Sequence, residues 1–257
     1  MNTISTLSIR DSIYELIKFA KCNQRFVHTR WGDVCLLMLT DLYVNQILGK
    51  SNKNKVNDSV ISLMKNAWNL DGKDVLVGIN KGTPNHEGGH NVPTKALIQT
   101  GLNFNKKFLA AVAIERIFLD YPQECIEFFN YINKTSYLFV GQYYNKCLDK
   151  FYGPNVGWCQ TPSFNSINYT EDILKDILTN LKTSNPRKII FSCGQAARVL
   201  CSELYNKFEG TLLDVGSMSD MVIINCEQFK NIAKRTHVSV NLTKIKNLLR
   251  IYEKSLS

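Results

Sequence analysis

Hydrophobic and polar positions follow two different periods along this chain. Short runs of β-branched and aromatic residues, typical of buried strands, alternate with longer stretches in which apolar residues recur every three or four positions. The expected strands are RFVHT (25–29), DVLVGI (74–79), SYLFVG (136–141), VGWCQT (156–161), KIIFSC (188–193) and TLLDVG (211–216). This alternation predicts a single α/β domain with a mainly parallel, Rossmann-like sheet flanked by helices.

The helical period is clearest in several of the intervening stretches. They are SIRDSIYELIKFAK (8–21), VCLLMLTDLYVNQIL (34–48), NKKFLAAVAIERIFLD (105–120), PQECIEFFNYI (122–132), TEDILKDILTNLK (170–182) and AARVLCSELYNKF (196–208), with a last helix over 242–254. The polar run 49–59 and the Gly-, Pro- and His-rich run 81–93 are expected to be loops. Neither is long enough to require a domain boundary, so we expect one domain over 1–257. Its core is expected over about 12–237, with a basic C-terminal helix over 238–257.

Composition and charge narrow the class of protein. The chain has 257 residues, 44% hydrophobic and 21% charged, and no stretch approaches the roughly 18 apolar residues that span a bilayer. The formal charge is +9, but Lys and Arg are dispersed among acidic residues, which argues against a nucleic-acid partner. We expect a cytoplasmic protein with at most peripheral membrane association through the basic stretch 234–254. The eight cysteines form no CxxC pair and are expected to be reduced and buried.

The stretch 188–220 indicates a strand, a glycine turn, a helix and a second strand. Ligands of open parallel sheets collect beyond the carboxyl ends of strands, where helix N-termini attract anions. Gly194 and Gln195 are therefore candidate contacts for a phosphate or a sugar, although such a turn also needs a glycine for its own geometry. Asp214, Ser217 and Asp220 follow the end of the next strand.

A second candidate site is the polar segment Arg30–Asp33, which interrupts the apolar run FVHTRWGDVCLLML (26–39). Asp33 is expected to cap the helix that follows, which explains the carboxylate but not Arg30 and Trp31. An arginine at a strand end suits the clamping of a diphosphate. A carboxylate beyond Gly32 suits a divalent cation or sugar hydroxyls.

Other polar residues stand at the ends of expected strands. Asn80 and Lys81 follow VLVGI and are candidate ligand contacts. Gln142 after LFVG and Asn165 within TPSFNS carry amides suited to a base edge or a sugar hydroxyl, and structural turn roles are equally open. The three tryptophans are expected to lie in the core.

The segment HEGGH (86–90) matches the H-E-x-x-H pattern of zinc hydrolases, with Glu115 as a conceivable third ligand. That chemistry needs both histidines on one face of a helix, and two glycines cost about 2 kcal/mol of helix propensity. A loop that carries Glu87 over the site, excludes water and supplies a base is the preferred interpretation. A merely exposed polar loop is the other.

The order of RWGD, VLVGIN, LFVGQ, TPSFNS and GTLLDVGSMSD resembles the glycosyltransferases of the GT-D fold, over about 12–237. Members carry an RWGDGE or RFGDGE segment near the N-terminus and a late DVGSxxD or DIGH segment. The resemblance implies a Rossmann-like transferase whose Asp-x-Glu pair holds a divalent metal, Mn²⁺ or Mg²⁺, on a nucleotide diphosphate. Asp33 matches the Asp, but Cys35 stands at the Glu position, and hard cations prefer oxygen ligands.

The implied function is sugar transfer from a nucleoside diphosphate sugar to a hydroxyl of a glycan or glycoconjugate acceptor. Asp33, Asp220 and Glu87, in falling order, are candidates for the base. The metal is held by Asp33 with water and phosphate, or Arg30 and Lys81 replace it as counter-charge, or catalysis has been lost. A zinc-dependent hydrolase and a non-catalytic nucleotide- or glycan-binding module remain alternatives.

Overall fold

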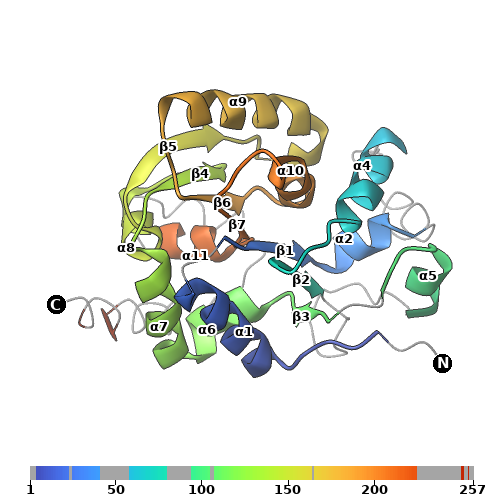
Figure 1. Cartoon of the computed structure of the whole chain (residues 1–257), viewed down its shortest axis with the longest axis horizontal. Helices are drawn as coiled ribbons and strands as arrows, with labels where there is room; N and C mark the ends of the chain where they lie inside the picture. Colours follow the sequence, from blue (N-terminus) through green and yellow to red (C-terminus); the bar gives the residue numbers. More distant parts are fainter. Residues whose placement is uncertain are drawn as a thin grey trace.

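A parallel sheet forms the centre of the molecule. The computed structural model describes residues 4–22, 25–40, 58–79, 94–104, 107–163 and 165–224, together with 250, 251 and 254. Within them the seven-stranded sheet has the order β3-β2-β1-β7-β6-β4-β5, with every pair parallel (Figure 1). The strands are β1 (Val27–Trp31), β2 (Val75–Ile79), β3 (Leu109–Ala110), β4 (Tyr137–Gly141), β5 (Asn155–Gln160), β6 (Lys188–Ser192) and β7 (Thr211–Asp214). The predicted α/β class is confirmed.

Helices cover both faces of this sheet (Figure 1). One face carries α2 (Asp33–Met38), α4 (Asp58–Trp68), α9 (Thr170–Thr183) and α10 (Ala196–Leu204). The other carries α1 (Ile9–Lys21), α6 (Ala113–Asp120), α7 (Pro122–Ile132), α8 (Asp149–Tyr152) and α11 (Met218–Ile224). Shorter elements are α5 (Thr94–Gln99), η2 (Lys146–Leu148) and η3 (Ser166–Tyr169).

The neighbouring parallel strands β1 and β7 are followed by helices on opposite faces of the sheet. β1 continues into α2 on one face, whereas β7 continues into α11 on the other. In open α/β sheets the carboxyl ends of such diverging neighbours form the topological switch point, where ligands bind. The fold therefore directs attention to the residues after Thr29 and after Leu213.

Local sequence explains where the helices begin and which face they bury. The Ser8 side chain accepts a hydrogen bond from the Asp11 N–H at 3.1 Å and so caps α1. α1 buries Ile13, Leu16 and Ile17 at helical spacing. Pro122 occupies the first turn of α7, where its missing N–H costs nothing.

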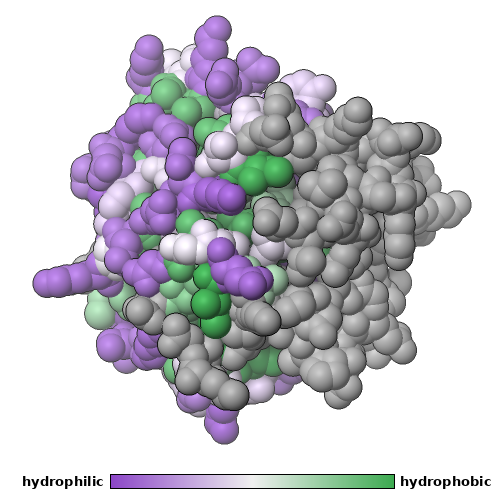
Figure 2. Space-filling model, turned by 90° about the vertical axis from the view of Figure 1, so that its right-hand side faces the viewer, coloured by the Kyte–Doolittle hydropathy of each residue, from purple (hydrophilic) through white to green (hydrophobic). Residues whose placement is uncertain are grey.

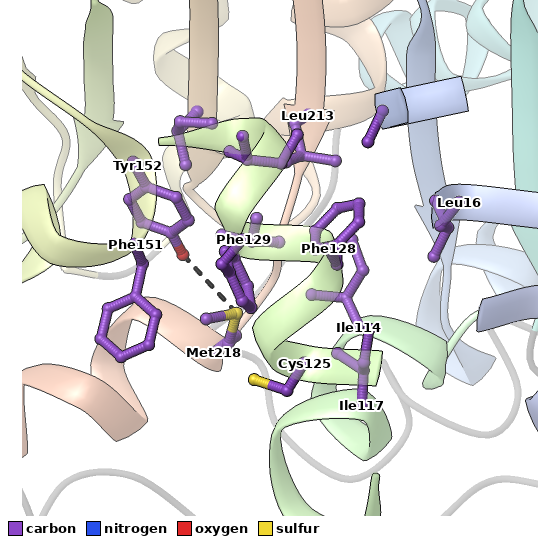
Figure 3. Packing of buried hydrophobic residues seen from close by; sticks show 14 of the residues in the cluster. Leu16, Ile114, Ile117, Cys125, Phe128, Phe129, Phe151, Tyr152, Leu213 and Met218 are labelled. Carbon is purple, nitrogen blue, oxygen red and sulfur yellow. Dashed lines mark hydrogen bonds between the residues drawn. The ribbon is translucent and has the colours of Figure 1, made fainter. Parts of the chain in front are cut away.

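Aromatic side chains fill the core on both faces. Beneath β7, Phe128 and Phe129 of α7 meet Phe151 and Tyr152 of α8, and the Tyr152 hydroxyl lies 3.6 Å from the Met218 sulfur (Figure 3). On the opposite face the rings of Trp31 and Trp68 meet edge to face, with centroids 4.9 Å apart. Both faces of the sheet are thus apolar, as a buried parallel sheet requires.

Several sequence predictions are wrong in detail. The expected helix 105–120 instead begins with strand β3, and α6 starts only at Ala113. Helices α4 and α11 were not expected. In the helix predicted over 34–48, α2 ends at Met38, and 41–48 lie outside the described residues. Trp158, expected in the core, is 39% exposed.

The cysteines and the surface complete this description. Seven described cysteines are free thiols; five are buried as expected, whereas Cys147 is partly exposed and Cys22 is exposed. Figure 2 shows the side to the right of Figure 1, where hydrophilic side chains cover most of the described surface and apolar ones show between them. No helix among the described residues is long and apolar enough to cross a membrane.

Candidate functional site

The RWGD segment (30–33) and the DVGS segment (214–217) meet at the carboxyl ends of β1 and β7. The backbone N–H of Arg30 donates to Oδ2 of Asp214 at 3.1 Å. The other carboxylate oxygen, Oδ1, accepts the backbone N–H of Gly216 at 3.0 Å. We use the name β1–β7 corner for residues 30–33 and 214–217, together with Glu115 and Arg198.

Arg198 joins the ends of three strands. Its Nε donates to the carbonyl of Arg30, its Nη1 donates to the carbonyl of Gly194, and its Nη2 lies 3.4 Å from Oδ2 of Asp214. Both side chains of this ion pair are buried. Burial, the largest single influence, would lower the pKa of Arg198, but Asp214 together with the neighbouring cysteines raises the pKa above its usual value. The guanidinium therefore fixes β1, β6 and β7 relative to one another.

Arg30 is held by a second ion pair. Its Nε donates to the carbonyl of Ala111 at 2.6 Å, and its Nη2 lies 2.9 Å from Oε1 of Glu115. The Ser217 hydroxyl donates to the same Glu115 oxygen at 2.7 Å. Burial would raise the pKa of Glu115, but Arg30 and Ser217 together lower it below its usual value. Glu115, considered above as a zinc ligand, is instead the counter-ion of Arg30.

Gly216 is required by this arrangement. Its φ is +55°, a conformation that costs other residues about 1–2 kcal/mol. A Cβ at this position would also overlap Nη1 of Arg30. The DVGS turn and the arginine therefore fit together only with glycine at 216.

The charges of the corner balance internally. Arg198 is matched by Asp214 and Arg30 by Glu115, so these two arginines bring no net positive charge to a diphosphate. The predicted clamping by Arg30 would need its guanidinium to exchange a buried partner for the ligand. Lys81, the other predicted cation, lies outside the described residues, as do Asn80, Glu87 and both histidines of HEGGH.

No described side chain fills the space beside Gly32. Gly32 has φ −68° and ψ 173°, and among the described residues, apart from its chain neighbours, no atom lies within 4 Å of the position that a Cβ would take. Neither backbone strain nor crowding requires glycine here, which favours close approach of a ligand to the backbone. Asp33, the first residue of α2, is partly exposed beside this space.

The expected metal pair is not complete. Cys35 is buried in an apolar cluster with Trp31 and Val199, and burial raises the pKa of its thiol, so the sulfur is not a companion ligand to Asp33. Both oxygens of Asp214 are already bonded within the corner. In the part of the chain that the structure describes, no three His, Cys, Asp or Glu side chains are grouped to hold a metal ion. These residues therefore do not fit an Asp-x-Glu metal site.

The turn after β6 adjoins the corner. Gly194 is exposed with φ +59°, and the Ser166 hydroxyl is 3.8 Å from where its Cβ would be. Ser166 donates to the carbonyl of Cys193 at 2.5 Å, which holds the TPSFNS segment against this turn. Asn165 precedes it with φ +53°, and Gln195 is the N-cap of α10. Gly194, Gln195 and Asn165 thus lie at one rim, as their strand-end positions predicted.

The remaining candidates differ in how they face this rim. Trp31 is 1% exposed as a whole residue, so it has almost no surface with which to contact a ligand. Gln142 follows β4, whose last residue pairs with Ser192 of β6, and is partly exposed. Asp220 lies in the first turn of α11, and burial raises its pKa to about 6.

Sequence reasoning missed three buried members of the network. Arg198 lies within α10, where a side chain gives no strand-end signal, but it stands four residues after Gly194 and its guanidinium returns over the turn. Glu115 had no sequence signal as a partner of Arg30. In His28 the Nδ1 lies 3.2 Å from the Asp214 carbonyl, whereas the buried Nε2 has no hydrogen-bond partner among the described residues. Burial, aided by Arg30, lowers the pKa of His28 to about 3.

Comparison with known proteins identifies the fold. No protein-family model and no curated protein sequence matches the chain. Two solved structures of the domain of unknown function 1792 are similar, and each match covers 92% of this chain and 85% of the other. One, the selenomethionine-substituted form, has a TM-score of 0.58 at 16% identity; the other, described as having a distinct glycosyltransferase fold, has 0.56 at 17%. The resemblance to GT-D-fold glycosyltransferases is thereby confirmed at the level of the fold.

Proposed function

We propose that this chain is a glycosyltransferase that moves a sugar from a nucleoside diphosphate sugar to a hydroxyl of a glycan or glycoconjugate. The observation that carries the proposal is the hydrogen bond between Arg30 and Asp214, which joins the RWGD and DVGS segments at one rim. That rim is the switch point of the sheet, where α/β folds bind ligands. The glycosyltransferase fold of similar structures supports the same reading.

The balanced charges of the corner shape the proposed mechanism. The donor diphosphate needs positive charge, but the charges of Arg30 and Arg198 are already paired with Glu115 and Asp214. We assign that role to Lys81, or to a divalent cation that arrives on the diphosphate beside Asp33. The buried ion pairs keep the backbone rigid, so that the leaving diphosphate meets preorganised groups.

The base that takes the acceptor proton is assigned to a carboxylate of the rim. Asp33 is the first candidate because it is partly exposed beside the space at Gly32. Asp220 is the second, since a pKa of about 6 leaves it mostly ionised at neutral pH yet able to hold a proton. Glu87, outside the described residues, is the third.

A thermal-shift panel tests donor binding. UDP-, GDP- and dTDP-sugars are added with and without Mn²⁺ to the wild type, to Lys81→Ala and to the control Lys175→Ala, an exposed lysine on α9. A ligand that binds only the native state at about 100 times its Kd adds about 2.7 kcal/mol of stability. We expect one nucleotide to raise the melting temperature, and Lys81→Ala to weaken that effect or make it depend on Mn²⁺. If no nucleotide sugar shifts the melting temperature, the proposal fails.

Asp33→Asn separates a transferase from a non-catalytic binding module. Loss of a general base lowers turnover by about 10²–10⁴-fold, whereas donor binding and the melting temperature of the free protein stay close to wild type. Sugar transfer and donor hydrolysis are measured by release of the nucleoside diphosphate. A wild type that binds a donor but releases no diphosphate with any acceptor would favour the binding module.

A further inference from the structure

The edge strand β5 exposes a tryptophan at the opposite end of the sheet from β3. Trp158 is 39% exposed, whereas Trp31 and Trp68 are 1% and 2% exposed. Val156, two residues earlier on the same face of the strand, is 40% exposed. A large apolar ring in this position contributes little to the core and is available to a ligand.

The orientation of this ring is fixed by the protein. The indole N–H donates to the carbonyl of Gly141 at 2.9 Å, which draws Trp158 toward the carboxyl end of β4. Its ring centroid lies 6.1 Å from that of Tyr144, with 38° between the planes. The Tyr144 hydroxyl in turn donates to Oδ1 of Asp149 at 3.0 Å. We call Tyr144 and Trp158 the aromatic platform; its rings are held in place before any ligand arrives.

Two glutamines lie at the carboxyl ends of the strands that flank the platform. Gln160 ends β5, is exposed, and pairs in register with Gly141, the residue before Gln142. Each amide offers two N–H donors and a carbonyl acceptor. An exposed aromatic face with neutral donors and acceptors at its side suits a sugar ring, whose C–H face is apolar and whose rim carries hydroxyls.

The distance between the platform and the β1–β7 corner indicates whether the bound ring belongs to the donor or to another molecule. β6 and β4 lie between β7 and β5, and neighbouring strands are about 4.8 Å apart, so the platform is roughly 15 Å from the β1–β7 corner. The transferred sugar would be bonded to the diphosphate at the corner. A ring on the platform therefore belongs to a different, extended molecule.

We propose that Tyr144 and Trp158 form a subsite for a sugar ring of an oligosaccharide acceptor, one or more rings away from the hydroxyl that is glycosylated. The ring stacks on the indole, and its hydroxyls bond to Gln142 and Gln160. That the bound saccharide is the acceptor rests on the proposed function. The binding of a saccharide by the platform can be tested separately.

The test uses an array of immobilised oligosaccharides of two to six rings, followed by fluorescence titration with the free form of any that bind. Because the other two tryptophans are buried, a ligand on the platform changes the emission of Trp158. We expect Trp158→Ala to raise the Kd about tenfold or more, as loss of a stacking ring does elsewhere. Trp158→Phe keeps a flat ring and should hold the Kd within about threefold while losing the emission change.

Two controls make the comparison specific. Tyr14→Ala removes an aromatic side chain that is 45% exposed on α1 and should leave saccharide binding unchanged. Trp158→Ala should remain folded, because the Gly141 carbonyl also accepts the N–H of Thr161 at 3.2 Å and keeps a partner. The melting temperature of each variant checks this.

The outcomes separate the two proposals. The platform is overturned if the wild type binds no saccharide on the array, if Trp158→Ala binds as tightly as wild type, or if UDP, GDP or dTDP alone causes the Trp158 emission change. In the last case the ring holds the donor base. Saccharide binding that depends on Trp158, without any binding of nucleotide sugars, would support the platform and remove the proposed function.

Discussion

The β1–β7 corner and the aromatic platform lie on the same carboxyl edge of one sheet but are built in opposite ways. In the corner, the charged side chains of Arg30, Arg198 and Asp214 are buried and bonded to one another. In the platform, Trp158 is exposed, uncharged and held by a single hydrogen bond. Buried charges that satisfy each other fix the backbone, whereas an exposed ring remains free to bind. Substitutions of the buried charged residues in the corner should therefore damage the fold, and substitutions in the platform should damage only binding.

The largest effect is expected for Asp214→Asn. The substitution leaves Arg198 buried without its carboxylate, and breaking a buried ion pair costs about 3–5 kcal/mol. Urea unfolding followed by circular dichroism measures this loss. Asp176→Asn, an exposed carboxylate on α9, is the matched control and should change the free energy of unfolding by less than about 0.5 kcal/mol. A loss below about 1 kcal/mol for Asp214→Asn would show that the corner is not a structural unit.

The glycines of the corner should separate structure from binding. Gly216→Ala combines a strained φ with a clash against Arg30 and should cost about 3 kcal/mol of stability. Gly101→Ala, at φ +72° with no atom of another described residue within 4 Å of its Cβ position, isolates the strain and should cost about 1–2 kcal/mol. Gly32→Ala should leave stability within about 0.5 kcal/mol but weaken nucleotide-sugar binding. Equal stabilities for the Gly216 and Gly101 variants would argue against the contact with Arg30.

His28 gives the corner a dependence on pH. Its folded pKa is about 3 and its unfolded pKa about 6.5, so between these values the unfolded chain binds a proton that the folded chain does not. Stability from this group is present above pH 6.5 and is lost as the pH falls toward 3. Between pH 7 and pH 5 the wild type should lose about 2 kcal/mol relative to His28→Asn, measured by urea unfolding at both pH values. A difference that does not change with pH would place His28 in a more polar setting.

Only a small effect on stability is expected in the platform. Trp158→Ala removes a ring that is mostly outside the core and should lower the free energy of unfolding by less than about 1 kcal/mol. Trp68→Ala, which removes a ring buried against Trp31, should cost about 3–5 kcal/mol. Thermal melts of the two variants compare them directly. If both lose the same stability, the platform belongs to the core.

The sequence predicted the strands better than their neighbours in the sheet. The apolar runs at 74–79 and 188–193 matched β2 and β6 because β-branched residues mark buried strands. β3 was missed because Leu109–Ala110 is too short for a period and lies in a run, FLAAVA, that favours a helix. The position of β7 between β1 and β6 depends on contacts far apart in the chain, which local patterns do not encode.

The sequence predicted where the residues of the candidate site lie in the sheet but not which side chains they bond to. Strand ends placed Arg30, Asp214 and Gly194 at one rim, because parallel strands share one carboxyl edge. Their hydrogen-bond partners could not be predicted, since Arg198 and Glu115 reach the corner from separate helices on opposite faces. Arg30 was therefore predicted to clamp a ligand, whereas in the structure its charge is already paired with that of Glu115.

The central place of β7 has a consequence for biosynthesis. The hydrogen bond from Arg30 to Asp214 spans 184 positions, which a ribosome covers in roughly 10–40 s. Until β7 is synthesised, β1 and β6 both lack the strand that lies between them in the finished sheet, and an unpaired strand edge can recruit another chain. The nascent protein is therefore most prone to aggregate just before its seventh strand emerges, and a chaperone that shields the edge of β1 or β6 at that stage should raise the yield.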